Sequence, residues 1–248
     1  MKNLQKRGVA QLIERVVWDH EAAGLSPVAP TILKNKKGEV TMINTKQLRC
    51  WIGGLGMALP WIVLGLSLAF GYGFPDSISA TYFRDPCIAP FMMILGSAGV
   101  LLFCYKGYDI VDNILNTAAG VFGWCICLFP CAAKDGLIGT FQLPATTSDT
   151  IHMISAIAFF GILAYNSFFQ FTKGVADPTP NKKKRNVIFR ICGVGMVTSF
   201  VLLPLANFGV INIPHVIWWI EAIALAFFGI SWLTKANCIP FLFADKNN

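Results

Sequence analysis

Residues 215–234 read HVIWWIEAIALAFFGISWLT, and this stretch decides the fold. Its only ionisable residues are His215 and Glu221. An α-helix needs roughly 20 apolar residues to cross a hydrocarbon core about 30 Å thick, and the stretch has that length. It lacks the two-residue alternation of a lipid-facing barrel strand, and within hydrocarbon a helix satisfies its own backbone. The stretch therefore predicts a transmembrane helix.

Five further windows have the same character on the N-terminal side of this stretch. Hydrophobic residues make up 55% of the 248-residue chain and charged residues 13%, whereas a soluble domain carries about 25% charged residues. This deficit of charge is expected where lipid replaces water around the protein. The sequence predicts an all-α, polytopic membrane protein, a six-transmembrane-helix bundle whose other spans are about 51–72, 88–105, 114–131, 151–171 and 187–206.

Lysine and arginine are distributed asymmetrically about the six windows. Of the 20 basic residues, all except Arg84 and Lys134 belong to one predicted side of the membrane. Basic flanks stay cytoplasmic, so both termini are expected in the cytoplasm, and an even number of spans agrees with this. The cluster Lys182–Arg185 predicts contact with anionic membrane lipid. Because the cations follow the membrane flanks without interleaved aromatic residues, no nucleic-acid partner is expected.

Three segments follow from this pattern. Residues 1–47 form a cytoplasmic segment in which apolar residues recur at helical spacing, and a short amphipathic helix is expected over about 5–23. That helix lies on the membrane surface or docks a cytoplasmic partner, and the sequence leaves both open. Residues 48–236 form the transmembrane domain, and residues 237–248 form a cytoplasmic tail.

A polar loop separates the first two windows, where residues 73–91 read GFPDSISATYFRDPCIAPF. The predicted topology places this loop on the outer side, and it is either an ordinary wet turn or the lip of a site. On the second interpretation its polar side chains bind a substrate. The candidate substrate-binding residues are Ser77, Ser79, Tyr82 and Arg84.

Glu221 is the most informative residue, because it lies six residues after the start of the last window, roughly 9 Å into the membrane. An ionisable group at that depth costs at least ~2–3 kcal/mol unless it faces a partner or water. The candidate partners are Arg84 and His152. Glu221, His152 and Asp85 are the candidate catalytic residues, with a carboxylate as general base and the histidine as proton shuttle. Alternatively, a buried Glu221–Arg84 pair locks two helices together.

Three strings together resemble a group of uncharacterised, chiefly bacterial multi-span membrane proteins, over about residues 50–236. The strings are Ser77-Ile-Ser79-x-x-Tyr82-x-Arg84-Asp85, Tyr105-Lys106-Gly107-Tyr108-Asp109, and Trp219-x-Glu221 followed by Gly229-x-Ser231-Trp232-x-x-Lys235. The resemblance implies a six-span protein of the bacterial cytoplasmic membrane. It transfers no established activity.

The chain is more distantly similar to the alkaline-ceramidase-like superfamily of intramembrane hydrolases. Those enzymes use a serine, an aspartate and a zinc ion held by three histidines, two of them paired as His-x₃-His on the last helix. Here His215 is followed by Trp218 and Trp219, so that pair is missing. The similarity implies that His152, His215 and Glu221 are candidate zinc ligands.

Three functions stay open at this stage. The first is binding or hydrolysis of a lipid or another amphiphile by Glu221 and His152. The second is a proton- or cation-coupled carrier or sensor, for which a homodimer is expected because six spans are few for a carrier. The third is a structural or assembly protein. One disulfide, between Cys87 and Cys131, is compatible with the predicted topology.

Overall fold

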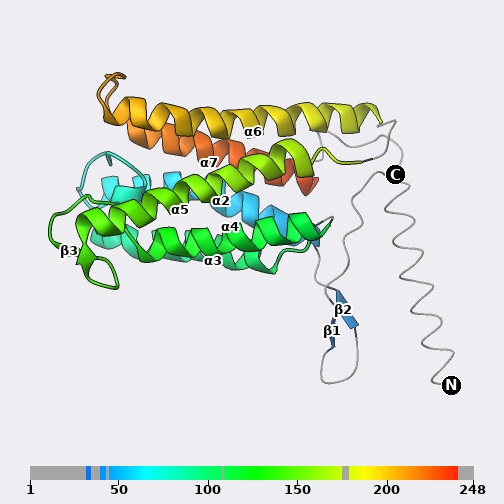
Figure 1. Cartoon of the computed structure of the whole chain (residues 1–248), viewed down its shortest axis with the longest axis horizontal. Coiled ribbons are helices and arrows are strands. Elements are labelled where there is room, and N and C mark those ends of the chain that lie inside the picture. Colours follow the sequence, from blue (N-terminus) through cyan, green and yellow to red (C-terminus); the bar gives the residue numbers. More distant parts are fainter. Residues whose placement is uncertain (1–31, 35–39, 43–44, 108, 175–178, 240–248) are drawn as a thin grey trace.

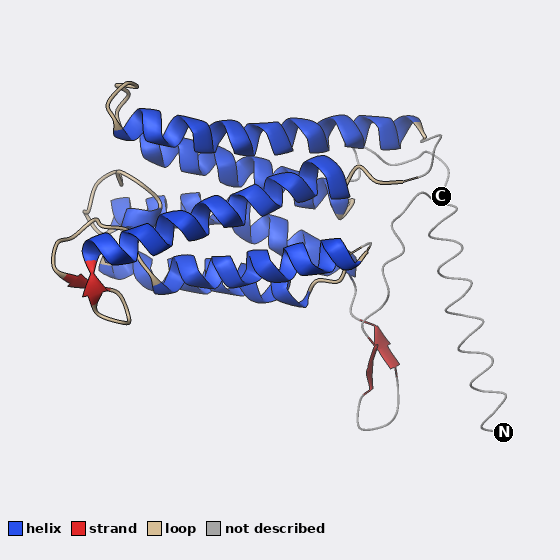
Figure 2. Cartoon of the chain, in the orientation of Figure 1, coloured by secondary structure: helices blue, strands red, loops and turns tan. Residues whose placement is uncertain are grey.

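The computed structural model describes residues 32–34, 40–42, 45–107, 109–174 and 179–239 (Figure 1). The amphipathic helix expected over residues 5–23 lies outside the described residues, and so does most of the expected C-terminal tail. The described part is dominated by helices, with only very short strands (Figure 2).

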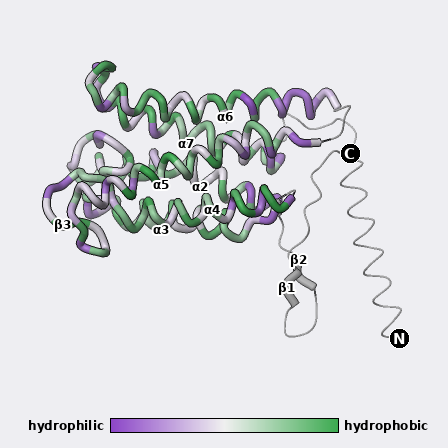
Figure 3. Tube along the Cα trace, in the orientation of Figure 1, coloured by the Kyte–Doolittle hydropathy of each residue, from purple (hydrophilic) through white to green (hydrophobic). Residues whose placement is uncertain are grey.

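Within the described part of the chain, six long helices confirm the predicted spans. Each is long and apolar enough to cross a membrane, and apolar residues run along the helices while hydrophilic ones gather at their ends (Figure 3). The fourth span continues from α5 into η2, a turn of π-helix. The elements are α2 (Thr45–Ala69), α3 (Asp85–Cys104), α4 (Ile110–Leu128), α5 (Ala145–Tyr165), η2 (Asn166–Gln170), α6 (Pro180–Asn207) and α7 (Val216–Lys235).

Short elements occupy the connections. The 3₁₀ helix η1 (Ser79–Phe83) lies in the polar loop between α2 and α3. Two antiparallel ladders were not expected from the sequence. In one, β1 (Ile32–Lys34) pairs with β2 (Val40–Met42), and in the other β3 (Leu137–Ile138) pairs with β4 (Leu143–Pro144) just before α5. They leave the all-α class unchanged, because they lie outside the bundle.

The six helices form a closed ring. Each of α2 to α6 packs on the next helix in the chain, and α7 packs on both α6 and α2. Glycines allow close approach at two of these contacts, as is common between membrane helices. A Cβ atom added to Gly53 of α2 would lie 2.9 Å from the carbonyl oxygen of Gly229 in α7, and one added to Gly120 of α4 would lie 2.6 Å from that of Gly99 in α3.

Cysteine pairing differs from the expectation. Cys87 and Cys131 are both free, so the disulfide considered between them is not formed. Cys50, near the start of α2, is instead bonded to Cys238, just beyond the end of α7, with the two Cα atoms 6.3 Å apart. The first span therefore begins at the same end of the bundle at which the last span ends, as an even number of crossings requires.

Candidate functional site

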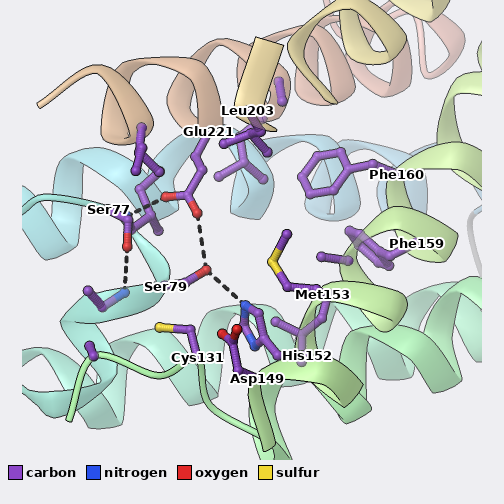
Figure 4. A pocket seen from close by; sticks show the side chains of 18 of the residues that line it. Ser77, Ser79, Cys131, Asp149, His152, Met153, Phe159, Phe160, Leu203 and Glu221 are labelled. Atoms are coloured by element: carbon purple, nitrogen blue, oxygen red, sulfur yellow. Dashed lines mark hydrogen bonds between the residues drawn. The ribbon is translucent and has the colours of Figure 1, made fainter. Parts of the chain in front are cut away.

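A cavity of about 380 Å³ lies inside the ring, toward the end that carries η1. All six helices contribute to its wall, which is apolar over most of its surface, and the polar residues lie together at one side (Figure 4). The volume falls within the range of small-molecule sites, about 300–1,000 Å³. The polar and ionisable residues in its wall are Asp76, Ser77, Ser79, Cys131, Asp149, His152, Asn207 and Glu221.

The polar loop supplies Ser77 and Ser79 to the cavity. The Ser77 hydroxyl accepts a hydrogen bond from the Ala80 backbone N–H at 2.9 Å, which starts the 3₁₀ turn in the way that serine caps a helix. Thr81 donates to the Ile78 carbonyl at 2.5 Å and is fully buried. These local bonds explain why the sequence Ser-Ile-Ser-Ala-Thr forms a compact turn whose first residues face the bundle.

Glu221 reaches this turn from α7. Its Oε2 accepts a hydrogen bond from the Ile78 backbone N–H, and its Oε1 accepts one from the Ser79 hydroxyl at 3.2 Å. The backbone N–H of Trp218 also donates to the Asp76 carbonyl at 3.1 Å, so α7 is hydrogen-bonded to the loop at two positions. The carboxyl group thus meets polar partners instead of lipid, as its depth in the membrane requires.

His152 approaches the same hydroxyl from α5. Its Nε2 lies 3.2 Å from Ser79 Oγ, and its Nδ1 lies 2.9 Å from the carbonyl oxygen of Phe129. A carbonyl can only accept, so Nδ1 carries a proton and Nε2 faces Ser79. The side chain of Ser79 therefore lies between Glu221 and His152, and the three residues form a chain of hydrogen bonds (Figure 4).

The Ser79 hydroxyl has a single hydrogen, so it can donate to Glu221 or to His152 but not to both. If Ser79 donates to Glu221, His152 Nε2 must donate to Ser79, and the histidine is then a cation beside a carboxylate. If Ser79 donates to Nε2, the histidine is neutral, and a protonated Glu221 can donate to Ser79. Both arrangements have zero net charge, and one converts into the other by proton transfer through Ser79.

The start of α5 also holds the loop that follows α4. Ser148 donates to the Pro130 carbonyl at 2.8 Å, and Asp149 accepts from the Ala132 N–H at 3.0 Å. Asp149 lies one helical turn before His152 and lines the same cavity. In this loop, burial raises the pKa of the Cys131 thiol to about 12, with a further contribution from the Glu221 and Asp149 carboxylates. Cys131 therefore remains a neutral thiol in the cavity wall.

Three of the expected catalytic and substrate-binding residues do not line the cavity. Arg84 does not pair with Glu221, because its guanidinium donates to the Ser67 hydroxyl and, at 2.9 Å, to the Gly73 carbonyl at the end of α2. Asp85 is an exposed residue in the first turn of α3, where a carboxylate complements the helix dipole. The Tyr82 ring packs edge-on against Phe83, with the ring centres 5.2 Å apart. These contacts keep Arg84, Tyr82 and Asp85 out of the cavity wall, and the roles expected for them stay predictions.

The three candidate zinc ligands do not converge. His215 precedes α7 in a left-handed backbone conformation. Its ring packs at a tilt against Phe74, with 4.5 Å between ring centres, and its Nδ1 lies 3.5 Å from Asp76 Oδ1. It contributes nothing to the cavity wall, whereas His152 and Glu221 do. Throughout the described ranges, no three His, Cys, Asp or Glu side chains are grouped so that they could hold a metal ion. The donor set therefore does not fit a zinc site.

Two contributions to the site were missed from the sequence. One is the Ile78 N–H, a backbone donor whose partner depends on the position of α7. The serine at position 77 could have indicated the start of a helical turn, because serine is preferred there. The other is the apolar wall from α5 and α6, which includes Phe160, Phe200 and Leu203. Nothing in their spacing distinguishes a cavity wall from ordinary helix packing.

Six spans arranged around a central cavity with a polar chain at one side define the class of protein: this is a multi-pass integral membrane protein. No match was found for the chain among known protein families, curated proteins or solved structures.

Proposed function

We propose that the protein binds a single amphiphile in the central cavity and hydrolyses an ester or amide bond in it. The observation that carries this proposal is the contact of Ser79 with His152, at 3.2 Å, at the polar side of an otherwise apolar cavity. An apolar chain would pack along Phe159, Phe160 and Phe200, and the carbonyl at its head would then lie beside Ser79.

His152 is suited to act as the base for Ser79. In a hydroxyl nucleophile site, a third group holds the histidine so that its free nitrogen faces the hydroxyl. Here the Phe129 carbonyl has that role, because it accepts the hydrogen bond from Nδ1. The Asp149 carboxylate, one helical turn away, would stabilise the cation that His152 becomes during the reaction.

The reaction follows from this arrangement. Ser79 Oγ forms a bond to the carbonyl carbon, its proton passes to His152 Nε2, and the carbonyl π electrons move onto the oxygen. The tetrahedral intermediate then expels the leaving group, which takes the proton from His152. A water molecule, deprotonated by the same histidine, releases the acid and restores Ser79. Glu221 holds the nucleophile in place through its bonds to Ile78 and Ser79.

The orientation in the membrane is part of the same proposal. The cavity end of the bundle carries Arg84 and Lys134, whereas the other basic residues of the described helices and of the turns next to them lie toward the opposite end. The positive-inside rule then places the cavity toward the outer leaflet of a bacterial cytoplasmic membrane and the start of α2 in the cytoplasm.

An alkyl fluorophosphonate tests the nucleophile directly, because Ser79 Oγ would displace fluoride and retain the phosphonyl group. Intact mass should increase by one adduct, and peptide mapping should place it on Ser79. Ser79→Ala should abolish labelling, and His152→Gln should slow it by about 100-fold or more, the usual contribution of a general base. The matched control is Ser155→Ala, since Ser155 is a buried α5 serine outside the cavity wall. Absence of the adduct, or normal labelling in His152→Gln, would refute hydrolysis.

A second function, proton-coupled transport, is favoured by the shared proton alone. The two neutral arrangements of Glu221, Ser79 and His152 allow a proton to be taken up and released without leaving a net charge in the membrane. Proton flux into proteoliposomes that is lost in Ser79→Ala, together with no fluorophosphonate adduct in the wild type, would select transport over hydrolysis.

A further inference from the structure

A second polar cluster lies at the other end of the bundle, where α2 begins and α7 ends. We call Arg49, Gln170, Lys182 and Trp232 the basic-end cluster. Trp232 comes eleven residues after Glu221 on α7, which places it roughly 16 Å further along the helix axis. The cluster is therefore separate from the cavity, and none of its members lines that cavity.

Arg49 has an incomplete set of partners. It is 9% exposed, its Nε donates to the Tyr105 hydroxyl at 3.1 Å, and its guanidinium lies 5.5 Å from the centre of the Tyr105 ring. Its Nη2 is buried and has no hydrogen-bond partner. Burial raises the pKa of Tyr105, so this phenol stays neutral and does not neutralise the arginine.

Lys182 adds a second buried cation. It is 8% exposed, and its Nζ donates to the Phe171 carbonyl at 3.1 Å, which is a neutral acceptor. The Nζ of Lys235 lies 5.2 Å from the centre of the Phe171 ring. Lys182 and Lys235 therefore both lie beside Phe171, whose ring packs on Trp232, and Trp232 packs on the Tyr105 ring next to Arg49. Like charges repel strongly where water is excluded, so a bound anion would stabilise this end of the bundle.

Neutral donors without partners surround the same rings. The Nε2 of Gln170 and the Nε1 of Trp232 are buried and lack hydrogen bonds, and the residues are 1% and 0% exposed. The Trp232 ring packs edge-on against Tyr105 and Phe171, with ring centres 5.1 and 5.2 Å apart, and Phe171 directly follows Gln170. A buried donor without a partner loses its hydration with no compensation, so native proteins rarely leave one.

The backbone beside this cluster is also unusual. Gln170 ends η2, a π-helical turn at the end of the fourth span. Such turns are rare and are found frequently at functional sites. Here the turn places Gln170 next to Phe171, whose carbonyl binds Lys182 and whose ring lies below Lys235.

We propose that the basic-end cluster binds a phosphate group of net negative charge, carried by an anionic membrane lipid headgroup or free in solution. A phosphate accepts several N–H hydrogen bonds at once, and the planar guanidinium of arginine matches its geometry. Arg49 lies near the start of α2 and Trp232 near the end of α7, so a span of this length would bring the cluster close to a membrane surface. The site is independent of the reaction proposed for Ser79.

Three probes test the proposal with the full chain. Thermal unfolding is compared between nanodiscs of phosphatidylcholine alone and nanodiscs that also contain phosphatidylglycerol. It is also measured in detergent with and without added inorganic phosphate. Titration with phosphatidylglycerol under native mass spectrometry gives the affinity. We expect the phosphate-bearing anion to raise the unfolding midpoint and to bind in a saturable manner at one site.

Variants connect that binding to the cluster. Arg49→Gln and Lys182→Gln should each weaken binding by about tenfold, the lower limit for one charge-assisted hydrogen bond. The matched control is Lys184→Gln, which removes an exposed cation from the same helix and should leave affinity within about twofold. Tyr105→Phe removes the hydrogen bond of Arg49 but no charge, so it should retain binding even if it lowers stability.

The outcomes separate the sources of the anion. Stabilisation by phosphatidylglycerol alone assigns the site to a lipid headgroup, and stabilisation by inorganic phosphate that competes with the lipid assigns it to phosphate in general. If neither probe binds better than phosphatidylcholine, the proposal is overturned. It is also overturned if Lys184→Gln weakens binding as much as Lys182→Gln, because the effect would then be one of surface charge. Should Arg49→Gln not fold, Lys182→Gln and Tyr105→Phe still decide the result.

Discussion

Replacement of Glu221 should distinguish its hydrogen bonds from its charge. Glu221→Ala removes the acceptor of the Ile78 N–H. Ile78 is only 3% exposed, so water does not replace that acceptor. A buried donor left without a partner costs about 1–3 kcal/mol. Glu221→Gln retains an oxygen that can accept from Ile78 and an amide that can donate to Ser79 Oγ, so most of this cost is avoided. We therefore expect the alanine variant to be less stable than the glutamine variant by about 1–3 kcal/mol.

The assay is thermal unfolding of both variants in nanodiscs, followed by tryptophan fluorescence. Trp218 is fully buried, and its backbone N–H donates a hydrogen bond to the Asp76 carbonyl. Its fluorescence therefore reports on the loop that Glu221 holds. A difference of 1–3 kcal/mol corresponds to about 2–12 °C in a protein of this size. Ile223→Ala, at a lipid-facing position of α7, controls for the effect of alanine on the helix. Equal midpoints for the alanine and glutamine variants would show that Ile78 does not depend on Glu221.

Two further predictions concern stability away from the cavity. Gly53→Ala should destabilise the protein by about 1–3 kcal/mol, because the added Cβ overpacks against the Gly229 carbonyl. Gly54→Ala is the control and should be nearly neutral, because its Cβ meets nothing within 4 Å. Equal thermal midpoints for the two variants would exclude a tight α2–α7 contact. The hydrogen bond from Lys173, at 2.7 Å, lowers the pKa of the Asp109 carboxyl in the folded protein. The ionised carboxyl therefore stabilises the fold at pH values above its unfolded pKa, and this stabilisation is lost as pH falls through the lower, folded pKa. Asp109→Asn should therefore cost about 0.5 kcal/mol at neutral pH, since the pair is partly exposed, and progressively less as pH falls through the folded pKa. A constant cost across a pH series of denaturation curves would contradict this.

The helices could be predicted from the sequence because a membrane span is a local property. A window such as 215–234 contains its own evidence, since its length and composition alone determine whether it can cross hydrocarbon. The structure moves the boundaries by a few residues, for example to Val216–Lys235 in the last span. Caps and short turns extend or end each helix, and these depend on single side chains such as Thr179, which accepts from the Lys182 N–H at the start of α6.

The site was predictable in part. Glu221 and His152 were singled out because ionisable residues within a span need partners, and the structure connects them through Ser79. Arg84 was also a candidate partner of Glu221, but its guanidinium donates instead to the Gly73 carbonyl beyond the end of α2. The choice depends on how each helix is rotated about its axis, which packing sets.

The sequence by itself determined the class of the protein, its six spans and the depth at which one carboxyl group is buried. It could do so because the backbone hydrogen bonds of a membrane helix are satisfied within the segment itself. Helix packing, which no single window contains, brings Glu221 to the Ile78 N–H and Ser79 and buries Arg49 and Lys182 at the opposite end of the bundle. Those contacts join residues far apart in the chain, so they exist only once helix packing has brought the side chains within hydrogen-bonding distance.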